Sequence, residues 1–219
     1  MTLSPNAEAL RHRLETGELG DRLVAVNEIR ELPPEEGFEL LQLAIADGNA
    51  RVRYSAVSQF DTVGTTDLAK AETLLRDRLL QDSEMDVKAA AADCLSALKI
   101  TSAFEDLVDA YNGTSEWLLR FSIVAALGVL GDARGFDVLA QALESDTELE
   151  RLAAISALGD LGDDRAIALL LPLVGNEDWQ VRYRVAQALK PFTAQEAVKA
   201  AIATLAADSV PQVAEEAQR

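Results

Sequence analysis

The 219-residue chain has one cysteine, one histidine and few basic residues, and each scarcity excludes a class of protein. A single cysteine, Cys94, allows no internal disulfide and is typical of a reducing compartment. With His12 as the only histidine, the chain has no zinc-ligand spacing, no Cys–His dyad and no Ser–His–Asp set. The formal net charge of −17 opposes binding to nucleic acid or to an anionic membrane surface.

Long apolar runs are also missing. No segment approaches the roughly 18 to 20 apolar residues of a membrane-spanning helix, so we expect no membrane insertion. The N-terminal segment MTLSPNAEALRHRLE is polar and has no apolar core, and we therefore expect no secretory signal. These features predict a cytoplasmic protein.

What the chain has in abundance is a repeating pattern of alanine, leucine and valine. The copies can be aligned on a basic residue near the start of the second apolar segment of each, and the intervals between these residues are 31 to 35. The aligned residues are Arg22, Arg53, Lys88, Arg120, Arg151 and Arg182, with Ala214 in a degenerate last copy. In each copy an earlier apolar segment with helical period precedes this one, so each unit is predicted to be helix, turn, helix. Gly131 and Gly162 are predicted to end helices in the left-handed conformation.

A helical hairpin cannot bury its apolar face alone, and stacked neighbours bury it instead. The sequence therefore predicts an all-α protein, a right-handed α-solenoid of about six to seven helical hairpins. We expect one continuous domain over residues 1–219, with an N-terminal capping helix within residues 1–20 and repeats over 21–219. No strand is expected.

The second helix of each copy is predicted to have two distinct faces. Counted from its basic residue, positions −1, +3, +4 and +7 lie together and form the core, whereas +1, +2 and +5 point away. Second helices usually line the concave surface of such a solenoid, where aromatic side chains suit docking of a partner. The outward set includes Tyr54, Phe121, Tyr183 and Arg184. The alternative is that these rings pack against a neighbouring turn, and for Phe121 we favour packing.

Other residues have two interpretations as well. Trp117 and Trp179 either seal a repeat junction or anchor a partner. The basic residues, Arg182 among them, are interpreted as a ladder in which an aspartate of each turn caps its helix and pairs with an arginine, with ligand binding as the alternative. Cys94 is interpreted as a small core residue, or else as a thiol that transiently holds a ligand. The aspartates of the ladder are Asp47, Asp82, Asp146, Asp178 and Asp208.

The segment ALGDLGDDRAIALLLPLVGNEDWQVRYRVAQAL resembles the short HEAT repeat of the phycobilisome lyase type, through its LG-D-x-R-A link and its W-x-V-R-x-x-A-x-x-A-L second helix. The resemblance spans about residues 20–210. A chain made only of such repeats is most similar to the cyanobacterial phycobilisome degradation proteins of the NblB type, and next to the bilin lyase subunits of the CpcE and CpcF type.

The resemblance implies binding to phycobiliprotein subunits, phycocyanin and allophycocyanin, and the detachment or handling of their bilins, with phycocyanobilin as a transient ligand. It implies no intrinsic cofactor and no metal, and it carries over no catalytic residue. A phycocyanobilin lyase subunit and a non-catalytic interaction scaffold are the alternatives, and catalysis through Cys94 is left open. The candidate residues for binding a partner or a bilin are Tyr54, Trp117, Phe121, Trp179, Arg182, Tyr183 and Arg184.

Overall fold

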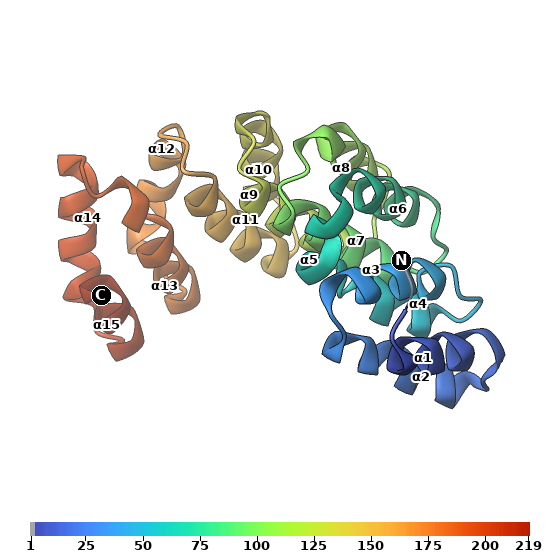
Figure 1. Cartoon of the computed structure of the whole chain (residues 1–219). Helices are drawn as coiled ribbons and strands as arrows, with labels where there is room; N and C mark the ends of the chain where they lie inside the picture. The colour runs from blue at the N-terminus through green and yellow to red at the C-terminus, as the bar shows by residue number, and fades with distance from the viewer. Residues whose placement is uncertain (1–2) are drawn as a thin grey trace. The chain divides into compact units, whose positions relative to one another are not determined.

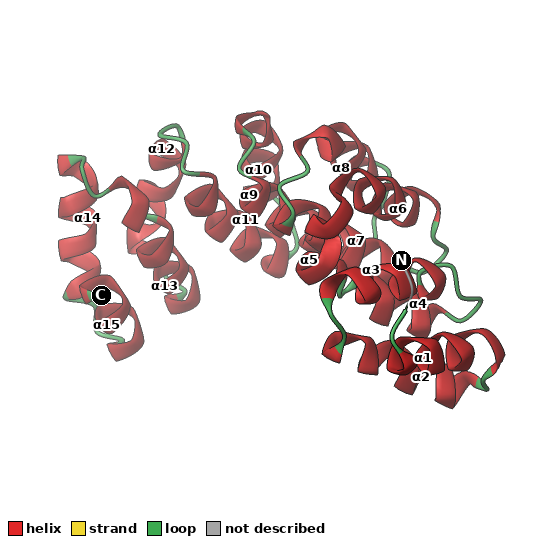
Figure 2. Ribbon diagram, in the orientation of Figure 1, coloured by secondary structure: helices red, strands yellow, loops and turns green. Residues whose placement is uncertain are grey.

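The computed structural model describes residues 3–219, and every regular element in this range is a helix (Figure 2). This confirms the predicted all-α class. The chain forms two compact units, which we call the N-terminal unit (Met1–Ser122) and the C-terminal unit (Ile123–Arg219). One continuous domain stays a prediction, and each unit is described by itself.

The N-terminal unit stacks helical hairpins. Its α-helices are α1 (Pro5–Thr16), α2 (Leu19–Glu28), α3 (Pro34–Ala44), α4 (Ala50–Val57), α5 (Phe60–Val63), α6 (Leu68–Gln81), α7 (Met85–Ala97), α8 (Phe104–Asn112) and the first part of α9 (Trp117–Leu130). Short 3-10 helices are η1 (Ile29–Glu31), η2 (Gly64–Asp67) and η3 (Thr101–Ala103). The second helices α2, α4 and α7 pack one against the next, while α1 packs on α3 and α6 on α8 (Figure 1). The unit is thus two layers of helices.

The C-terminal unit repeats this arrangement. It contains the rest of α9, then α10 (Phe136–Leu143), α11 (Glu148–Leu161), α12 (Ala166–Leu170), α13 (Trp179–Ala188), α14 (Glu196–Ala206) and α15 (Pro211–Gln218), with 3-10 helices η4 (Ala133–Gly135), η5 (Leu171–Gly175) and η6 (Lys190–Phe192). The second helices α11, α13 and α15 pack in order, and α10 and α14 cover α11 and α15 (Figure 1). Stacked helical hairpins of this kind are the solenoid architecture that the repeat predicts.

The core lies where the helical period places it. In the copy that begins at Arg53, the predicted core residues Val52, Ala56 and Val57 on α4 and Phe60 at the start of α5 are all fully buried. The corresponding residues of α7 are fully buried too; they are Val87, Ala91, Ala92 and Leu95. One core position is charged, since Glu150 at −1 of α11 is 3% exposed and accepts a hydrogen bond from the Ser145 hydroxyl at 3.0 Å.

Helix ends follow the predicted signals. Ser4 caps α1, and Pro5 is its first residue, where a missing N–H costs nothing. Gly131 and Gly162 have φ of 75° and 68°, the left-handed conformation expected of them. A different glycine, Gly159, allows a close approach: a Cβ there would lie 2.6 Å from the Cα of Ala188 on the next second helix.

Arginine–aspartate pairs join consecutive turns, and we call them turn staples. In each, the Nε and Nη2 of one arginine donate to both oxygens of an aspartate one repeat later, while its Nη1 donates to a carbonyl of its own preceding turn. The pairs, with their Nε–Oδ2 distances, are Arg22–Asp47 (2.8 Å), Arg53–Asp82 (2.7 Å) and Arg182–Asp208 (2.6 Å). The same aspartate accepts the amide two residues on, as Asp47 does from Asn49 at 2.7 Å. The predicted ladder is present at these three junctions.

The predicted pairing with an arginine is wrong at two positions, although the predicted helix cap is present at one of them. Asp146 makes no ion pair within residues 3–219, and Asp178 caps α13 by accepting the Gln180 amide at 2.8 Å instead of pairing with an arginine. In these two turns, Ser145 and Asn176 occupy the position that the aspartate has in a turn staple. Their side-chain oxygens accept a hydrogen bond from the backbone amide two residues later, as the staple aspartates do. These neutral side chains close the turn without supplying a charge.

The copy that begins at Arg53 is irregular. Its second helix α4 ends at Val57, and a separate short helix, α5, follows. Gln59 between them is 5% exposed, and its Nε2 donates to the carbonyls of Val26 and Ser55 at 2.9 and 2.8 Å. A buried amide thus bridges two repeats at a position where most other copies have alanine.

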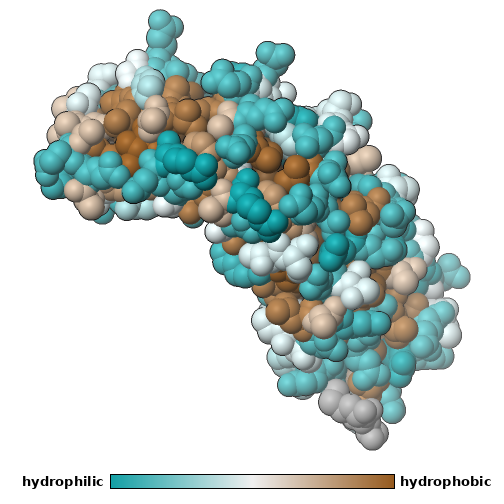
Figure 3. All heavy atoms as spheres, turned by 90° about the horizontal axis from the view of Figure 1, so that it is seen from above, coloured by the Kyte–Doolittle hydropathy of each residue, from teal (hydrophilic) through white to brown (hydrophobic). Residues whose placement is uncertain are grey.

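The surface has both polar and apolar side chains. On the face shown in Figure 3, hydrophilic residues are interspersed with smaller apolar patches. Within residues 3–219 no helix has the length and apolar character needed to span a bilayer.

Candidate functional site

Outward positions of the second helices contribute to pockets in both units. The N-terminal pocket has a volume of about 740 Å³ and lies among α4, α5, α7 and the first part of α9. Most of its lining consists of +1, +2 and +5 side chains of these helices and of carboxylates. They are Tyr54, Ser58, Asp61, Asp86, Ala89, Ala90, Asp93, Cys94, Ala97, Leu118 and Ser122.

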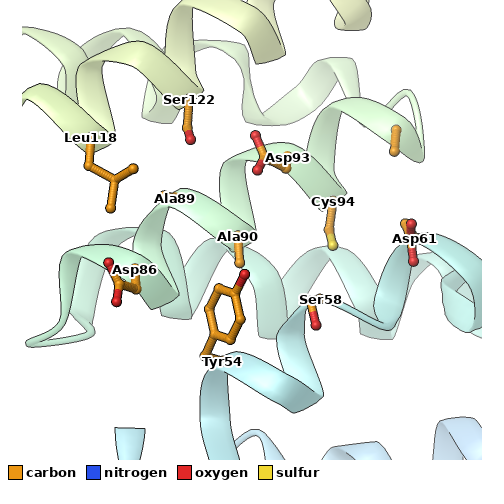
Figure 4. Close-up of a pocket in the computed structure, with 11 residues that line it drawn as sticks. Tyr54, Ser58, Asp61, Asp86, Ala89, Ala90, Asp93, Cys94, Leu118 and Ser122 are labelled. Carbon is orange, nitrogen blue, oxygen red and sulfur yellow. The ribbon is translucent and has the colours of Figure 1, made fainter. Parts of the chain in front are cut away.

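Figure 4 shows how the central side chains lie. The ring of Tyr54 rises from α4 toward α7, with its hydroxyl beside Ala90. Asp86 lies on one side of this ring, and Asp93 and Cys94 lie on the other. Tyr54 is 48% exposed, so the ring is accessible from the pocket instead of packing against the next turn.

Asp93 has the most perturbed carboxylate of the pocket. Desolvation raises its pKa to about 6, and no cation opposes this effect. Asp93 is exposed at the mouth of the pocket, and the nearby protein weakens the hydration of its carboxylate without removing it. The carboxyl group therefore takes up a proton as the pH falls through about 6 and is mostly charged at neutral pH.

Cys94 is 3% exposed at the base of this pocket, and its Sγ donates to the carbonyl of Val57 at 3.1 Å. Burial raises the pKa of the thiol to about 12. Since the thiolate is the nucleophilic form, this sulfur is inert at neutral pH. The geometry supports the interpretation of Cys94 as a core residue.

The C-terminal pocket is smaller, about 320 Å³, and has the opposite character. It is formed by α13 with contributions from α11 and α15. The lining residues are Leu152, Trp179, Gln180, Tyr183, Arg184 and Gln212. Aromatic rings and one cation thus take the place of the carboxylates of the N-terminal pocket.

Arg184 and Trp179 are the accessible groups of this pocket. Trp179 is 42% exposed, so part of its indole is accessible to a ligand. Within residues 3–219 Arg184 has no carboxylate partner, and its one hydrogen bond, to Gln187 Oε1, is long at 3.4 Å. Tyr183 is half-buried, and its hydroxyl accepts from Gln187 Nε2 at 3.3 Å.

The remaining candidates lie elsewhere. Arg182 is fully engaged in a turn staple with Asp208, which lowers the pKa of that carboxyl, and it lines neither pocket. Trp117 is 55% exposed at the start of α9, and Phe121 is half-buried one turn later. The structure therefore brings Trp179, Tyr183 and Arg184 together, places Tyr54 in the other pocket, and leaves the other three outside both.

Several pocket residues have no clear signal in the sequence. Asp93 is visible as the charged exception at +5, but the carboxylates of Asp61 and Asp86 resemble ordinary surface charge. Gln212 belongs to the degenerate last copy, whose divergence hides its helical register. Among the residues described, no group of three or more His, Cys, Asp or Glu is arranged to hold a metal ion.

The fold is that of an α-solenoid built from helical hairpins. The family profile of HEAT repeats matches residues 72–151 and 137–219, so the chain belongs to the HEAT-repeat family. Among solved structures, its fold is similar to a chain in the complex of CpcE and CpcF of phycocyanin lyase from Nostoc sp. PCC7120, with a TM-score of 0.64 and 18% identity, over 100% of this chain and 94% of that one. Human deoxyhypusine hydroxylase in complex with glycerol aligns with a TM-score of 0.41 and 20% identity, over 97% of this chain and 93% of that chain. No curated protein matches the sequence significantly.

Proposed function

We propose that this protein binds phycobiliprotein subunits through the outward face of its second helices, and handles or detaches their bilin chromophores in the course of phycobilisome degradation. The C-terminal pocket is the observation that carries the proposal. A bilin is a linear tetrapyrrole with flat conjugated rings and propionate carboxylates. Trp179 and Tyr183 offer flat faces for such rings, and Arg184 offers a cation without a carboxylate partner.

The physical fit has two parts. A guanidinium binds a carboxylate through paired, charge-assisted hydrogen bonds, so Arg184 suits a propionate. Exposed aromatic rings supply contact area with little loss of conformational freedom. The pocket volume of about 320 Å³ is at the low end of ligand sites. That size suits holding one part of a bilin while the rest remains on the phycobiliprotein.

The likeness in fold to the phycocyanin lyase complex supports a bilin-related role and favours a second candidate, a lyase subunit that attaches phycocyanobilin. In either role the binding proposed here is non-covalent, because Cys94 is buried as a thiol with a raised pKa and does not line the C-terminal pocket. The residues would orient a chromophore without forming a bond to it.

The test is to mix the purified protein with holo-phycocyanin, follow complex formation by size-exclusion chromatography, and record the bilin absorbance spectrum. We expect a complex and a changed spectrum. Trp179→Ala and Arg184→Gln are each expected to weaken binding about tenfold. Arg51→Gln is the matched control, because Arg51 is an exposed arginine of the other unit that lines neither pocket. Circular dichroism verifies that each variant keeps its helicity.

The possible outcomes separate the alternatives. If no complex forms and the spectrum does not change, the proposal is refuted. Covalent attachment of free phycocyanobilin to apo-phycocyanin, with no release from the holo form, would establish the lyase role instead. A complex with an unchanged spectrum would indicate a scaffold that does not handle the chromophore. Unaltered binding by both pocket variants would remove the C-terminal pocket as the site.

A further inference from the structure

The N-terminal pocket has a chemistry that the proposed function does not use. Three carboxylates line it, those of Asp61, Asp86 and Asp93, and none of the described residues that line it is basic. Elsewhere in the same unit the half-buried carboxylate of Asp47 and the buried carboxylate of Asp82 are both paired with arginines. The pocket therefore concentrates negative charge that the chain itself does not neutralise.

Asp93 is the clearest case. Asp93 is exposed at the mouth of the pocket, and no hydrogen bond or ion pair reaches its carboxylate from any residue in 3–219, although the nearby protein weakens its hydration. A carboxylate that loses hydration without gaining a partner is destabilised in its charged form. An incoming cation would restore the lost interaction, whereas an anion would be repelled.

The rest of the lining suits the stem and the flat head of an arginine. Ala89, Ala90 and Leu118 provide apolar surface for a methylene stem, and Tyr54 presents an exposed ring beside the carboxylates. A guanidinium stacks on an aromatic face and donates in several directions at once, which an ammonium does not. The chain already contains this pairing, since the guanidinium of Arg120 lies 4.0 Å from the ring centre of Tyr111.

We propose that the N-terminal pocket is a docking site for an arginine side chain presented by a protein partner, with Tyr54 stacking on the guanidinium and Asp93 and Asp86 accepting its hydrogen bonds. The partner is thereby specified as a protein with an exposed arginine in a protruding segment. The site lies in a different unit from the C-terminal pocket and does not depend on bilin binding, so either assignment stands if the other fails.

The arrangement makes docking sensitive to pH. The groups that face Asp93 are the Asp86 carboxylate and Cys94 thiol of α7, the Tyr54 hydroxyl of α4, Asp61 of α5 and the Ser122 hydroxyl of α9. None is a cation, so protonation of Asp93 removes attraction for arginine and nothing compensates. Because the pKa of Asp93 is about 6, docking is expected to weaken as pH falls through that value.

The experiment uses N-acetyl-arginine amide as the probe, titrated into the full-length ¹⁵N-labelled protein while amide chemical shifts are recorded. We expect shifts confined to α4, α5, α7 and the start of α9, with a dissociation constant on the order of 1 mM. N-acetyl-citrulline amide, which has nearly the same shape without charge, should cause no shifts there. N-acetyl-lysine amide should bind more weakly than the arginine probe.

Two variants complete the test. Asp93→Asn is expected to weaken arginine binding about fivefold at pH 7.5, and wild-type affinity is expected to fall similarly at pH 5. Asp109→Asn, which removes the same charge from an exposed position of α8 outside the pocket, should bind like wild type. Equal binding of citrulline amide, equal binding of lysine amide, or shifts scattered over the acidic surface would each overturn the proposal.

Discussion

Replacement of Asp93 by asparagine is expected to stabilise the protein at neutral pH. Desolvation raises the pKa of this carboxyl from 3.8 to about 6, so the folded state disfavours its charged form. Stability linked to this group is fully present below pH 3.8, where it is protonated in both states, and is lost as pH rises through about 6. At pH 7.5 the wild-type protein carries the whole cost of the charge, and an uncharged asparagine of similar shape carries none of it.

The magnitude follows from the pKa shift and the exposure of the side chain. A difference of about 2 pKa units corresponds to at most about 3 kcal/mol. Solvent reaches this carboxylate and screens it, which reduces the expected gain to about 1 kcal/mol. For a chain of this size that is a rise in melting temperature of about 2 to 4 °C. At pH 5 the gain should shrink to about half, because folded Asp93 is then mostly protonated.

Thermal unfolding followed by circular dichroism at pH 7.5, 6 and 5 measures this prediction. Asp109→Asn controls for the change in net charge and should stay within about 0.5 kcal/mol of wild type. If Asp93→Asn is less stable than wild type at pH 7.5, or equally stabilised at all three pH values, the carboxylate is not a desolvated and unpaired group. Since the same variant is expected to bind arginine less well, a loss of docking cannot be ascribed to unfolding.

Three further predictions concern packing and reactivity. Gly159→Ala should destabilise the protein by about 2 to 4 kcal/mol in a urea titration, because the added Cβ would meet the backbone of the next second helix. Gly20→Ala is the control, since its Cβ would enter free space, and it should stabilise the protein by about 0.5 to 1 kcal/mol. Equal effects of the two variants would refute the close approach at Gly159. Arg53→Gln should cost about 3 to 5 kcal/mol, since it takes the staple partner from the fully buried Asp82 carboxylate, and a cost under 1 kcal/mol would show that Arg78 suffices. Cys94 should react with a thiol reagent such as Ellman's reagent only after unfolding in urea, and rapid labelling of the native protein would contradict its burial and raised pKa.

The helical period was enough to predict the fold, because burial of one face is the dominant constraint on each second helix. Val57 and Leu95 lie in the core for that reason, and Tyr54 and Arg184 point away from it. The turn aspartates were less predictable. Any short side chain with an oxygen acceptor can close these turns, so a nearby aspartate such as Asp146 has no fixed role.

The pockets could not be predicted from the period. The volume of a pocket between helices depends on the distance between the helix axes, which cannot be derived from the helical period of one sequence. The stretch from Ser58 to Asp61, where α4 stops and α5 begins, shapes the N-terminal pocket from one side. The charge state of Asp93 depends in turn on that hollow, so its perturbed pKa is a property of the assembled unit.

The break between α4 and α5 also bears on how such a chain can change over evolutionary time. Adding or deleting a copy that lines neither pocket would lengthen or shorten the array and leave both pockets intact. The copy that begins at Arg53 is different, because its interrupted helix contributes Tyr54, Ser58 and Asp61 to the N-terminal pocket. Substitutions in that copy would change the N-terminal pocket, while the neighbouring copies keep the stacked architecture.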